Sequence, residues 1–284
     1  MGAITSTMYG AANTAQYALC YEGKTIKYKK YGWKTQLPDQ RDYYTLFDAS
    51  KNKDVNCVDL RDKCCPIYDQ GELGSCTANG IGFAFEFDMM KQKLKTFTPS
   101  RLFIYYNERV IEGTTDYDSG AYIRDGFKTI NKQGVCSEEK DWPYDITKFT
   151  EKPSSICYED GKKNVTVKYK KLVQNIEQFK ASLIEGFPIV FGFSVYESFE
   201  SDEVKKTGIV PLPKPDEPIL GGHCVCCVGF IEDKKQFIVR NSWGKDWGLS
   251  GYCMMPYEYL NSQDLASDFW IIETVEHDSS EYQK

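Results

Sequence analysis

The sequence has no apolar run long enough to cross a membrane as a helix. Its longest apolar stretch, residues 187–195, falls well short of the ~18 residues that such a helix needs and fits a buried strand. The first twenty residues lack the basic segment and the apolar segment of a secretory signal. No internal repeat and no low-complexity tract is visible. These absences predict an intracellular protein whose thiols are mostly free.

Histidine and net positive charge are also scarce. The 284 residues include 35 Lys and Arg against 41 Asp and Glu, a net charge of −6 with neutral His, which argues against a surface for nucleic acid. Only His223 and His277 can supply an imidazole. In contrast, 14% of the residues are aromatic, enough for a substantial core. The 11 cysteines are an odd number, so at least one lies outside any intramolecular disulfide.

The apolar pattern changes its period halfway along the chain. Residues 1–55 are polar, rich in Tyr and Lys, and predict an extended N-terminal extension. Apolar spacing predicts helices over residues 76–90, 99–109, 122–132 and 176–185. β-Branched and aromatic runs predict strands over residues 165–169, 189–195, 224–231, 236–240 and 270–275. We therefore predict an α+β protein of two subdomains, with the extension 1–55, a domain over 56–276 and a polar tail over 277–284.

Cys76 lies where a helix is predicted to begin, after a loop punctuated by glycines. Ser75 is the expected N-cap of this helix. The N-terminus of a helix carries a partial positive charge, which lowers the pKa of a thiol and makes it a nucleophile near neutral pH. Cys76 is therefore the candidate nucleophile.

A catalytic thiolate also needs an imidazole partner. His277 is flanked by acidic residues in the polar tail, where we expect it to be solvated. His223 opens an apolar strand and can face a cleft. Asn241 can then accept the imidazole N–H and fix its tautomer, and Trp243 can shield that hydrogen bond from water.

These motifs resemble the papain family of cysteine proteases, which includes the lysosomal cathepsins. The matching segments are Gln70-Gly71-x-x-Gly74-Ser75-Cys76, Gly222-His223-x-Val225 and Asn241-Ser242-Trp243-Gly244-x-x-Trp247-Gly248. His223 follows Cys76 by 147 residues and Asn241 follows it by 165, against about 130–150 in the family. The resemblance covers residues 58–274, and the residues around Cys76 are most similar to bacterial and giant-DNA-virus members.

The resemblance implies a helical left subdomain and an antiparallel, barrel-like right subdomain with the active-site cleft between them. It implies a catalytic set of Gln70, Cys76, His223 and Asn241, in which Gln70 and the Cys76 N–H form the oxyanion hole. It also implies a substrate-binding set of Gly74, Ser75, Gly120 and Trp243. The implied substrates are polypeptides. No metal, cofactor, nucleic acid or membrane is required, and a monomer is expected.

Some residues depart from the family pattern. Thr77 stands where most members have Trp, Leu73 stands where they have a disulfide-forming Cys, and Asp118-Ser119-Gly120 is all that remains of a Cys-Asn-Gly-Gly segment. These departures agree with a member that is not secreted, in a virion or a host cytoplasm. A lysosome-type compartment is the alternative.

Residues 1–55 precede the usual start of the mature enzyme but lack the long helical propeptide of cathepsin zymogens. We predict that they lie in or beside the cleft and limit substrate access, as a propeptide does. A stable packing arm is the alternative. The available anchors are Tyr17, Tyr21, Trp33, Tyr43 and, through a mixed disulfide with Cys76, Cys20. Residues 1–6 also match a loose N-myristoylation pattern, for which an unmodified terminus is the alternative.

The predicted activity is that of a cysteine endopeptidase acting through a covalent acyl-enzyme. Two other functions stay open: a catalytically silent binding or virion protein, and a thiol acyltransferase. Cys224, Cys226 and Cys227 are read as core residues in preference to metal ligands, because alternate strand residues face opposite sides.

Overall fold

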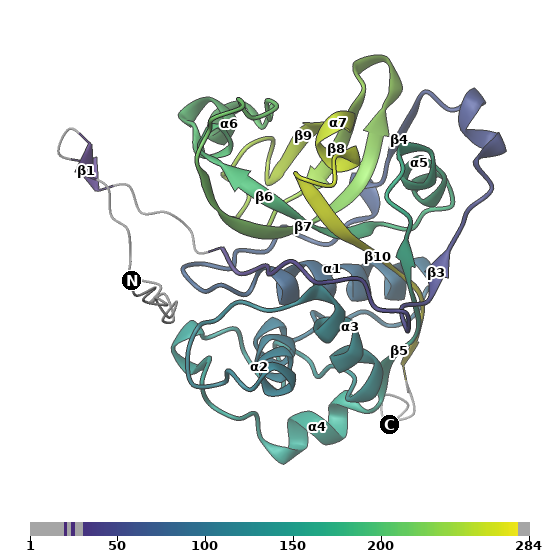
Figure 1. The fold of residues 1–284 in the computed structure, drawn as a ribbon. Coiled ribbons are helices and arrows are strands. Elements are labelled where there is room, and N and C mark those ends of the chain that lie inside the picture. Colours follow the sequence, from purple (N-terminus) through teal and green to yellow (C-terminus); the bar gives the residue numbers. More distant parts are fainter. Residues whose placement is uncertain (1–19, 22–23, 26–30, 278–284) are drawn as a thin grey trace, which may run out of the picture.

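Helices gather on one side of the molecule and strands on the other. The computed structural model describes residues 20–21, 24–25 and 31–277, and only the backbone of the first two ranges. The first subdomain contains α1 (Cys76–Lys91), α2 (Arg101–Glu112), α3 (Ile123–Lys132) and α4 (Ser155–Gly161). The second contains α5 (Ile176–Ile184), α6 (Asp202–Thr207) and α7 (Tyr257–Asn261) around most of the sheet (Figure 1).

The main sheet has the strand order β3-β5-β10-β6-β7-β8-β9, and β4 pairs with β7. Its strands are β3 (Tyr44–Thr45), β4 (Cys57–Asp59), β5 (Asn164–Leu172), β6 (Ile189–Tyr196), β7 (Ile219–Ile231), β8 (Gln236–Arg240), β9 (Tyr252–Pro256) and β10 (Ala266–His277). A separate hairpin joins β1 (Cys20–Tyr21) to β2 (Lys24–Thr25). All pairings are antiparallel except the one between β3 and β5, so the predicted α+β fold is confirmed.

Helix α1 is the central element of the molecule. Every residue from 76 to 89 is buried, because strands β6, β7 and β10 pack on it as well as helices α2 and α3. Glycines allow the close approach: a Cβ on Gly80 would lie 3.2 Å from the Cys224 sulfur on β7. The first residue of this helix, Cys76, is therefore held at the junction of the two subdomains.

Two helix starts differ in how they are capped. Ser100 accepts a hydrogen bond from the Phe103 N–H at the start of α2, as an N-cap does. Ser75 occupies the corresponding position before α1, but its side chain makes no cap bond. Its hydroxyl lies 2.5 Å from the Tyr144 hydroxyl instead, so the expected capping role of Ser75 is wrong.

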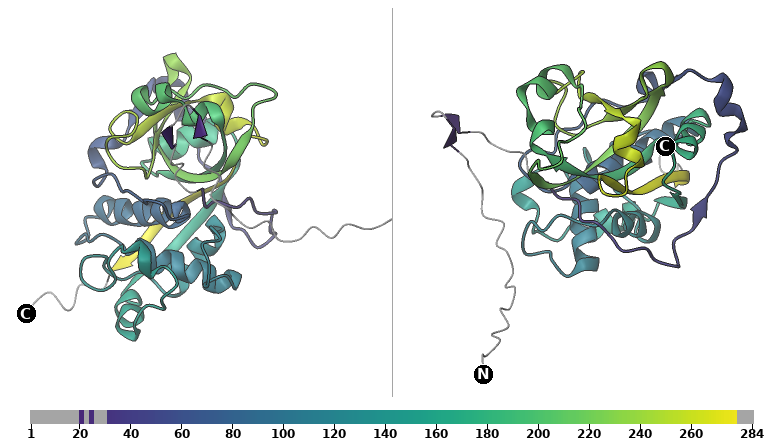
Figure 2. Two further views of the ribbon diagram at one scale, coloured as in Figure 1. Left: turned by 90° about the vertical axis from the view of Figure 1, so that its left-hand side faces the viewer. Right: turned by 45° about the horizontal axis from the view of Figure 1, so that its top comes forward.

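Residues 31–47, which we call the N-terminal strap, run between the two subdomains and then along the outside of the first (Figures 1 and 2). We divide the strap into a cleft segment, Tyr31–Lys34, and an anchor, residues 36–47. The short strand β3 of the anchor pairs with β5, and a 3-10 helix (Ala49–Asp54) follows. Apart from β3 and an isolated bridge at Trp33, residues 31–48 form no regular structure beyond turns, as expected for an extended segment.

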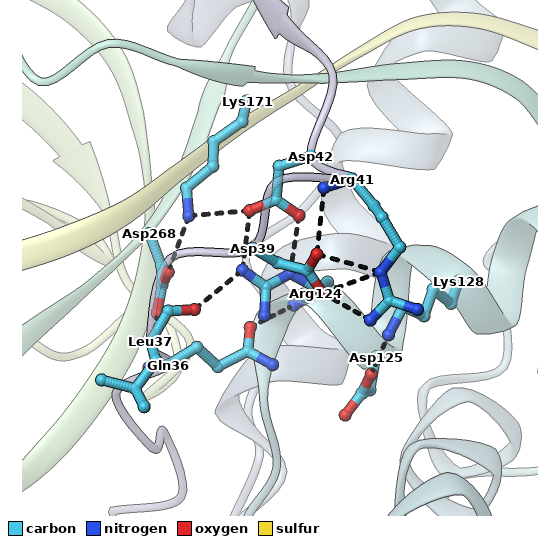
Figure 3. Close-up of polar contacts among 10 residues, drawn as sticks. All are labelled: Gln36, Leu37, Asp39, Arg41, Asp42, Arg124, Asp125, Lys128, Lys171 and Asp268. Atoms are coloured by element: carbon cyan, nitrogen blue, oxygen red, sulfur yellow. Dashed lines mark hydrogen bonds and ion pairs between the residues drawn. The ribbon is translucent and has the colours of Figure 1, made fainter.

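Buried charges fix the anchor to the body (Figure 3). Arg124 on α3 donates from Nε and Nη2 to Asp42, at 2.7 and 2.6 Å, and from Nη2 to the Leu37 carbonyl. Lys171 on β5 lies 3.2 Å from Asp42 and 3.5 Å from Asp268. Burial alone would raise the pKa of Asp42, but the hydrogen bonds from Arg124 and the charge of Lys171 outweigh it and lower that pKa. The anchor is thus integral to the charge balance of the folded domain.

Candidate active site

Cys76 is completely buried at the start of α1, beneath the strap. Burial raises the pKa of its thiol to about 12, although the backbone N–H groups of Cys224 and Gly32 favour the thiolate. The sequence predicts a lowered pKa at this helix start, so the structure differs from that expectation. The difference has a physical cause: a covered sulfur loses the solvation that a thiolate needs.

His223 and Asn241 are brought together by neighbouring strands. His223 lies on β7, and Asn241 directly follows β8, which pairs with β7. The Nε2 atom of His223 lies 2.8 Å from the Asn241 Oδ1, and both side chains are buried. The Trp243 ring stacks on the imidazole, with centroids 4.7 Å apart and an angle of 27° between the planes. This arrangement fixes the ring orientation and excludes water from the hydrogen bond.

The loop that carries Gln70 is tied to the loop that carries Asn241. The Gln70 N–H donates to the Ser242 carbonyl at 2.9 Å, and the Ser242 hydroxyl donates to the Gln70 Oε1 at 2.7 Å. The Gln70 Nε2 donates to the Leu73 carbonyl at 2.9 Å. These bonds orient the amide of Gln70 within the loop that leads into α1.

Two residues that the sequence reasoning missed hold the glycines of the predicted substrate-binding set. Asp118 accepts the Gly74 N–H at 3.1 Å, and the Tyr105 hydroxyl accepts the Gly120 N–H at 3.0 Å. The Tyr105 hydroxyl also donates to Asp118 at 2.5 Å. The place of Asp118 beside the Ser119-Gly120 pair was a usable signal. Tyr105 gave none, because it lies in the middle of α2.

The cleft segment bonds to both walls through its backbone. Ala121 donates to the Gly32 carbonyl at 2.7 Å, Lys34 donates to the Ala121 carbonyl at 3.1 Å, and Trp33 donates to the Gly222 carbonyl at 3.0 Å. A Cβ on Gly32 would lie 1.7 Å from the Gly74 carbonyl oxygen, and one on Gly120 would lie 2.1 Å from that of Gly32. Glycine is therefore required where the strap crosses the predicted cleft.

Two aromatic side chains of the strap flank Gly32. The indole of Trp33 packs on the backbone of Gly192 and Gly222. A Cβ added to Gly192 would lie 1.9 Å from the ring, and one added to Gly222 would lie 2.8 Å from it. Tyr31 lies on the other side, against His223 and Trp243, with ring centroids 6.2 and 6.1 Å away. The Tyr31 hydroxyl also contacts Glu200. Residues 31–34 of the extension thus lie against the predicted active-site residues, and the role of the extension in limiting substrate access stays a prediction.

The other histidine and the cysteines of β7 have side chains that lie in the body of the protein. His277 is half-buried at the end of β10 and contacts Asn164 and Phe97, so the expected solvated histidine is wrong. Cys224, Cys226 and Cys227 are buried in the core, as predicted. All ten described cysteines are free thiols. The predictions that concern residues 1–6, Tyr17, and the side chains of Cys20 and Tyr21 lie outside the described residues.

The described residues contain neither a membrane-spanning helix nor a cluster of metal ligands. No helix in this part of the chain is both long and apolar enough to span a bilayer. No group of three or more His, Cys, Asp or Glu side chains in the same part is placed to hold a metal ion.

Comparison with known proteins agrees with this geometry. The chain matches the papain family of cysteine proteases over residues 55–271. It is 48% identical to an uncharacterized peptidase C1-like protein of Acanthamoeba polyphaga mimivirus, over 87% of this chain and 88% of that protein. Procathepsin L of Felis catus is 29% identical, over 74% of this chain and 63% of its own length.

Solved structures give the same result. Xylellain, a cysteine protease from Xylella fastidiosa, superposes with a TM-score of 0.79 at 41% identity, covering 88% of this chain and 99% of its own. The chain therefore belongs to the papain family and is a cysteine peptidase. The resemblance to viral and bacterial members is confirmed.

Proposed function

We propose that the protein is an endopeptidase that works through Cys76, His223 and Asn241, and that its N-terminal strap inhibits it. The observation that carries the proposal is the His223–Asn241 hydrogen bond beneath Trp243, at the strand next to the start of α1. The Cys224 N–H, one residue after His223, points at the Cys76 sulfur. The candidate nucleophile and base are thereby positioned by adjacent backbone.

In the proposed reaction His223 takes the proton of the Cys76 thiol, and the resulting thiolate attacks the carbonyl carbon of the scissile peptide bond. The Gln70 amide and the Cys76 N–H stabilise the oxyanion that forms. His223 gives its proton to the leaving amine as the C–N bond breaks, which leaves a thioester. Water then attacks the thioester while His223 removes its proton, and the carboxylic acid leaves as the thiolate is restored. Asn241 keeps the imidazole oriented throughout.

The strap fits the role of a resident inhibitor that the enzyme does not cleave. Gly32 directs its N–H at the Cys76 sulfur, whereas its carbonyl oxygen is bonded to the Ala121 N–H and faces the cleft wall. Attack requires a carbonyl carbon in front of the thiolate, and the strap offers an N–H there instead. Burial beneath the strap also keeps the thiol protonated, because it raises the pKa of Cys76.

A peptide assay on the full chain tests this proposal. Gly32→Ala displaces the cleft segment, because its Cβ would overlap the Gly74 carbonyl, so this variant should hydrolyse peptides faster than the unaltered chain. Adding Cys76→Ala to it should abolish the hydrolysis without unfolding the protein. The strap's exposed Leu37 gives the control, since Leu37→Ala removes a side chain that is 86% exposed.

The same assay, run with and without an acceptor amine, separates the alternatives. Transfer of the acyl group to the amine at the expense of hydrolysis would indicate an acyltransferase. No turnover by Gly32→Ala, in a protein that still melts cooperatively, would refute the peptidase mechanism and favour a silent binding protein.

A further inference from the structure

The ammonium group of Lys34 occupies a site in the cleft wall formed by Glu112 and Tyr122. Its Nζ atom lies 2.8 Å from the Glu112 Oε2 and 5.3 Å from the centroid of the Tyr122 ring. The Glu112 side chain is only 5% exposed, although it lies at the end of α2, whereas that of Lys34 is 29% exposed. A carboxylate and an aromatic face are the two groups that proteins use to hold an organic cation.

Among the described residues, the other hydrogen-bond partner of Glu112 is the Tyr122 N–H, which donates to its Oε1 at 2.9 Å. Burial and the nearby charge of Asp125 raise the pKa of Glu112, while Lys34 and this N–H oppose the rise. When the cleft segment leaves, the carboxylate loses the Lys34 cation and keeps the Tyr122 N–H. A buried charge that has lost its partner is costly, so a replacement cation is favoured there.

The place of this site along the cleft follows from the strap. The Gly32 N–H meets the Cys76 sulfur, and Lys34 lies two residues further along, about 7 Å away in an extended chain. Tyr31 lies on the opposite side, against His223 and Trp243. His223 must stand beside the leaving amine, so residues after the cleaved bond lie on the Tyr31 side. Residues before the cleaved bond therefore lie on the Lys34 side.

We propose that Glu112 and the Tyr122 ring form a cation subsite that selects a Lys or Arg side chain at the third residue before the cleaved bond. Gly32, Trp33 and Lys34 overlie the first, second and third of these residues. The inference rests on the proposed peptidase mechanism, and it assigns that mechanism a substrate class. Lys34 is the internal occupant of a subsite that serves substrates once the strap has moved away.

Peptides that differ only in one ammonium group test the subsite. The full-length Gly32→Ala chain would be given N-acetylated fluorogenic peptides with identical first and second residues and with Lys, Arg or norleucine third. Norleucine resembles Lys without its charge. We expect kcat/KM to be about tenfold higher for Lys and Arg than for norleucine, because hydrogen bonds to charged groups are the stronger ones.

Substitution at the subsite gives the decisive comparison. Glu112→Gln in the Gly32→Ala chain should bring the Lys-to-norleucine ratio close to one. Glu185→Gln is the matched control, because Glu185 is an exposed acid paired with Lys51, and it should keep the ratio. If Glu112→Gln does not fold, Tyr122→Leu should lower the ratio roughly two- to fivefold through the loss of the ring.

Equal rates for Lys and norleucine, or a ratio that Glu112→Gln leaves intact, would overturn the subsite while the peptidase mechanism stands. A preference for unacetylated over acetylated norleucine peptides, without one for Lys, would assign the site to a terminal amine and also overturn it. Loss of all hydrolysis would count against the mechanism instead. In that case, the chain that carries both Gly32→Ala and Cys76→Ala still tests the subsite through peptide binding. We expect it to bind the Lys peptide more tightly than the norleucine peptide.

Discussion

The two parts of the strap are held to the protein in different ways. The cleft segment is held by backbone hydrogen bonds to Gly222 and Ala121, which any extended peptide could form, and by side-chain contacts of Tyr31, Trp33 and Lys34. The anchor is fixed by buried side-chain interactions, chiefly the two hydrogen bonds that Arg124 donates to Asp42. We infer that substrate replaces the cleft segment while the anchor stays bound to the protein. Opening the cleft does not require loss of the anchor.

The largest effect should come from breaking the anchor. Arg124→Ala leaves Asp42 buried with Lys171 as its remaining cation, so we expect a loss of about 3 kcal/mol in the free energy of unfolding. This corresponds to a fall in Tm of roughly 5–10 °C, measurable by calorimetry. Arg124→Lys keeps the positive charge but not the two-atom contact with Asp42, so its Tm should lie between those of the unaltered chain and Arg124→Ala. A Tm equal to that of the unaltered chain would mean that the anchor is dispensable.

A smaller change in stability, with a large gain in activity, should follow from Gly32→Ala. The added methyl group cannot fit against the Gly74 carbonyl, and such overpacking costs roughly 1–3 kcal/mol in the closed form only. Peptide hydrolysis should therefore rise about tenfold or more, while the Tm falls less than it does for Arg124→Ala. If activity and Tm fall together, the two parts of the strap are not separable.

The third prediction concerns the pH at which Cys76 reacts. In the closed form its pKa of about 12 lies above the ~8.5 of a free thiol. The protonated thiol therefore contributes its full stabilisation below pH ~8.5, and this contribution is lost as the pH rises towards 12. Alkylation of Cys76 by iodoacetamide should be slow at pH 7 in the unaltered chain and fast in Gly32→Ala.

Peptide mapping by mass spectrometry measures this rate, with the exposed Cys57 as an internal reference. Equal labelling of Cys76 in both chains at pH 7 would show that the strap does not protect the thiol.

The smallest effect should come from an ion pair that lies within the anchor but on its surface. Arg41 donates hydrogen bonds from Nε and Nη2 to the Asp39 carboxylate, yet its side chain is 85% exposed. Exposed pairs of this kind contribute little to stability, so Arg41→Ala should leave both Tm and peptide hydrolysis unchanged within error. A clear loss in Tm would show that surface charges, and not the buried contact of Arg124 with Asp42, hold the anchor.

The sequence carries the local part of this architecture. The start of α1 at Cys76 is predictable from the apolar spacing, and the pairing of His223 with Asn241 follows from the resemblance to the papain family. The sequence also predicts an extension in the cleft, but it identifies neither Gly32 as the crossing point nor Arg124 as its anchor. Those contacts join residues far apart in the chain, and no periodicity encodes them.

Errors of the sequence reasoning have the same origin. Ser75 does not cap α1 because the Tyr144 hydroxyl, 69 residues away, is its partner instead. The pKa of Cys76 is raised and not lowered because the strap buries it, which outweighs the helix dipole and the N–H donors around the sulfur. In both cases a tertiary contact overrides a local preference.

The short connection between the two parts of the strap has a kinetic consequence. Only residues 35–41 separate the cleft segment from Asp42, so the segment diffuses within a few nanometres of its binding site even when it is detached. Tethers of this length give effective concentrations in the millimolar range. A free peptide copied from residues 31–34 would have to reach a similar concentration to occupy the same cleft. Dilution should therefore leave the closed fraction of the protein unchanged, and a substrate competes with a local concentration that the cell cannot lower.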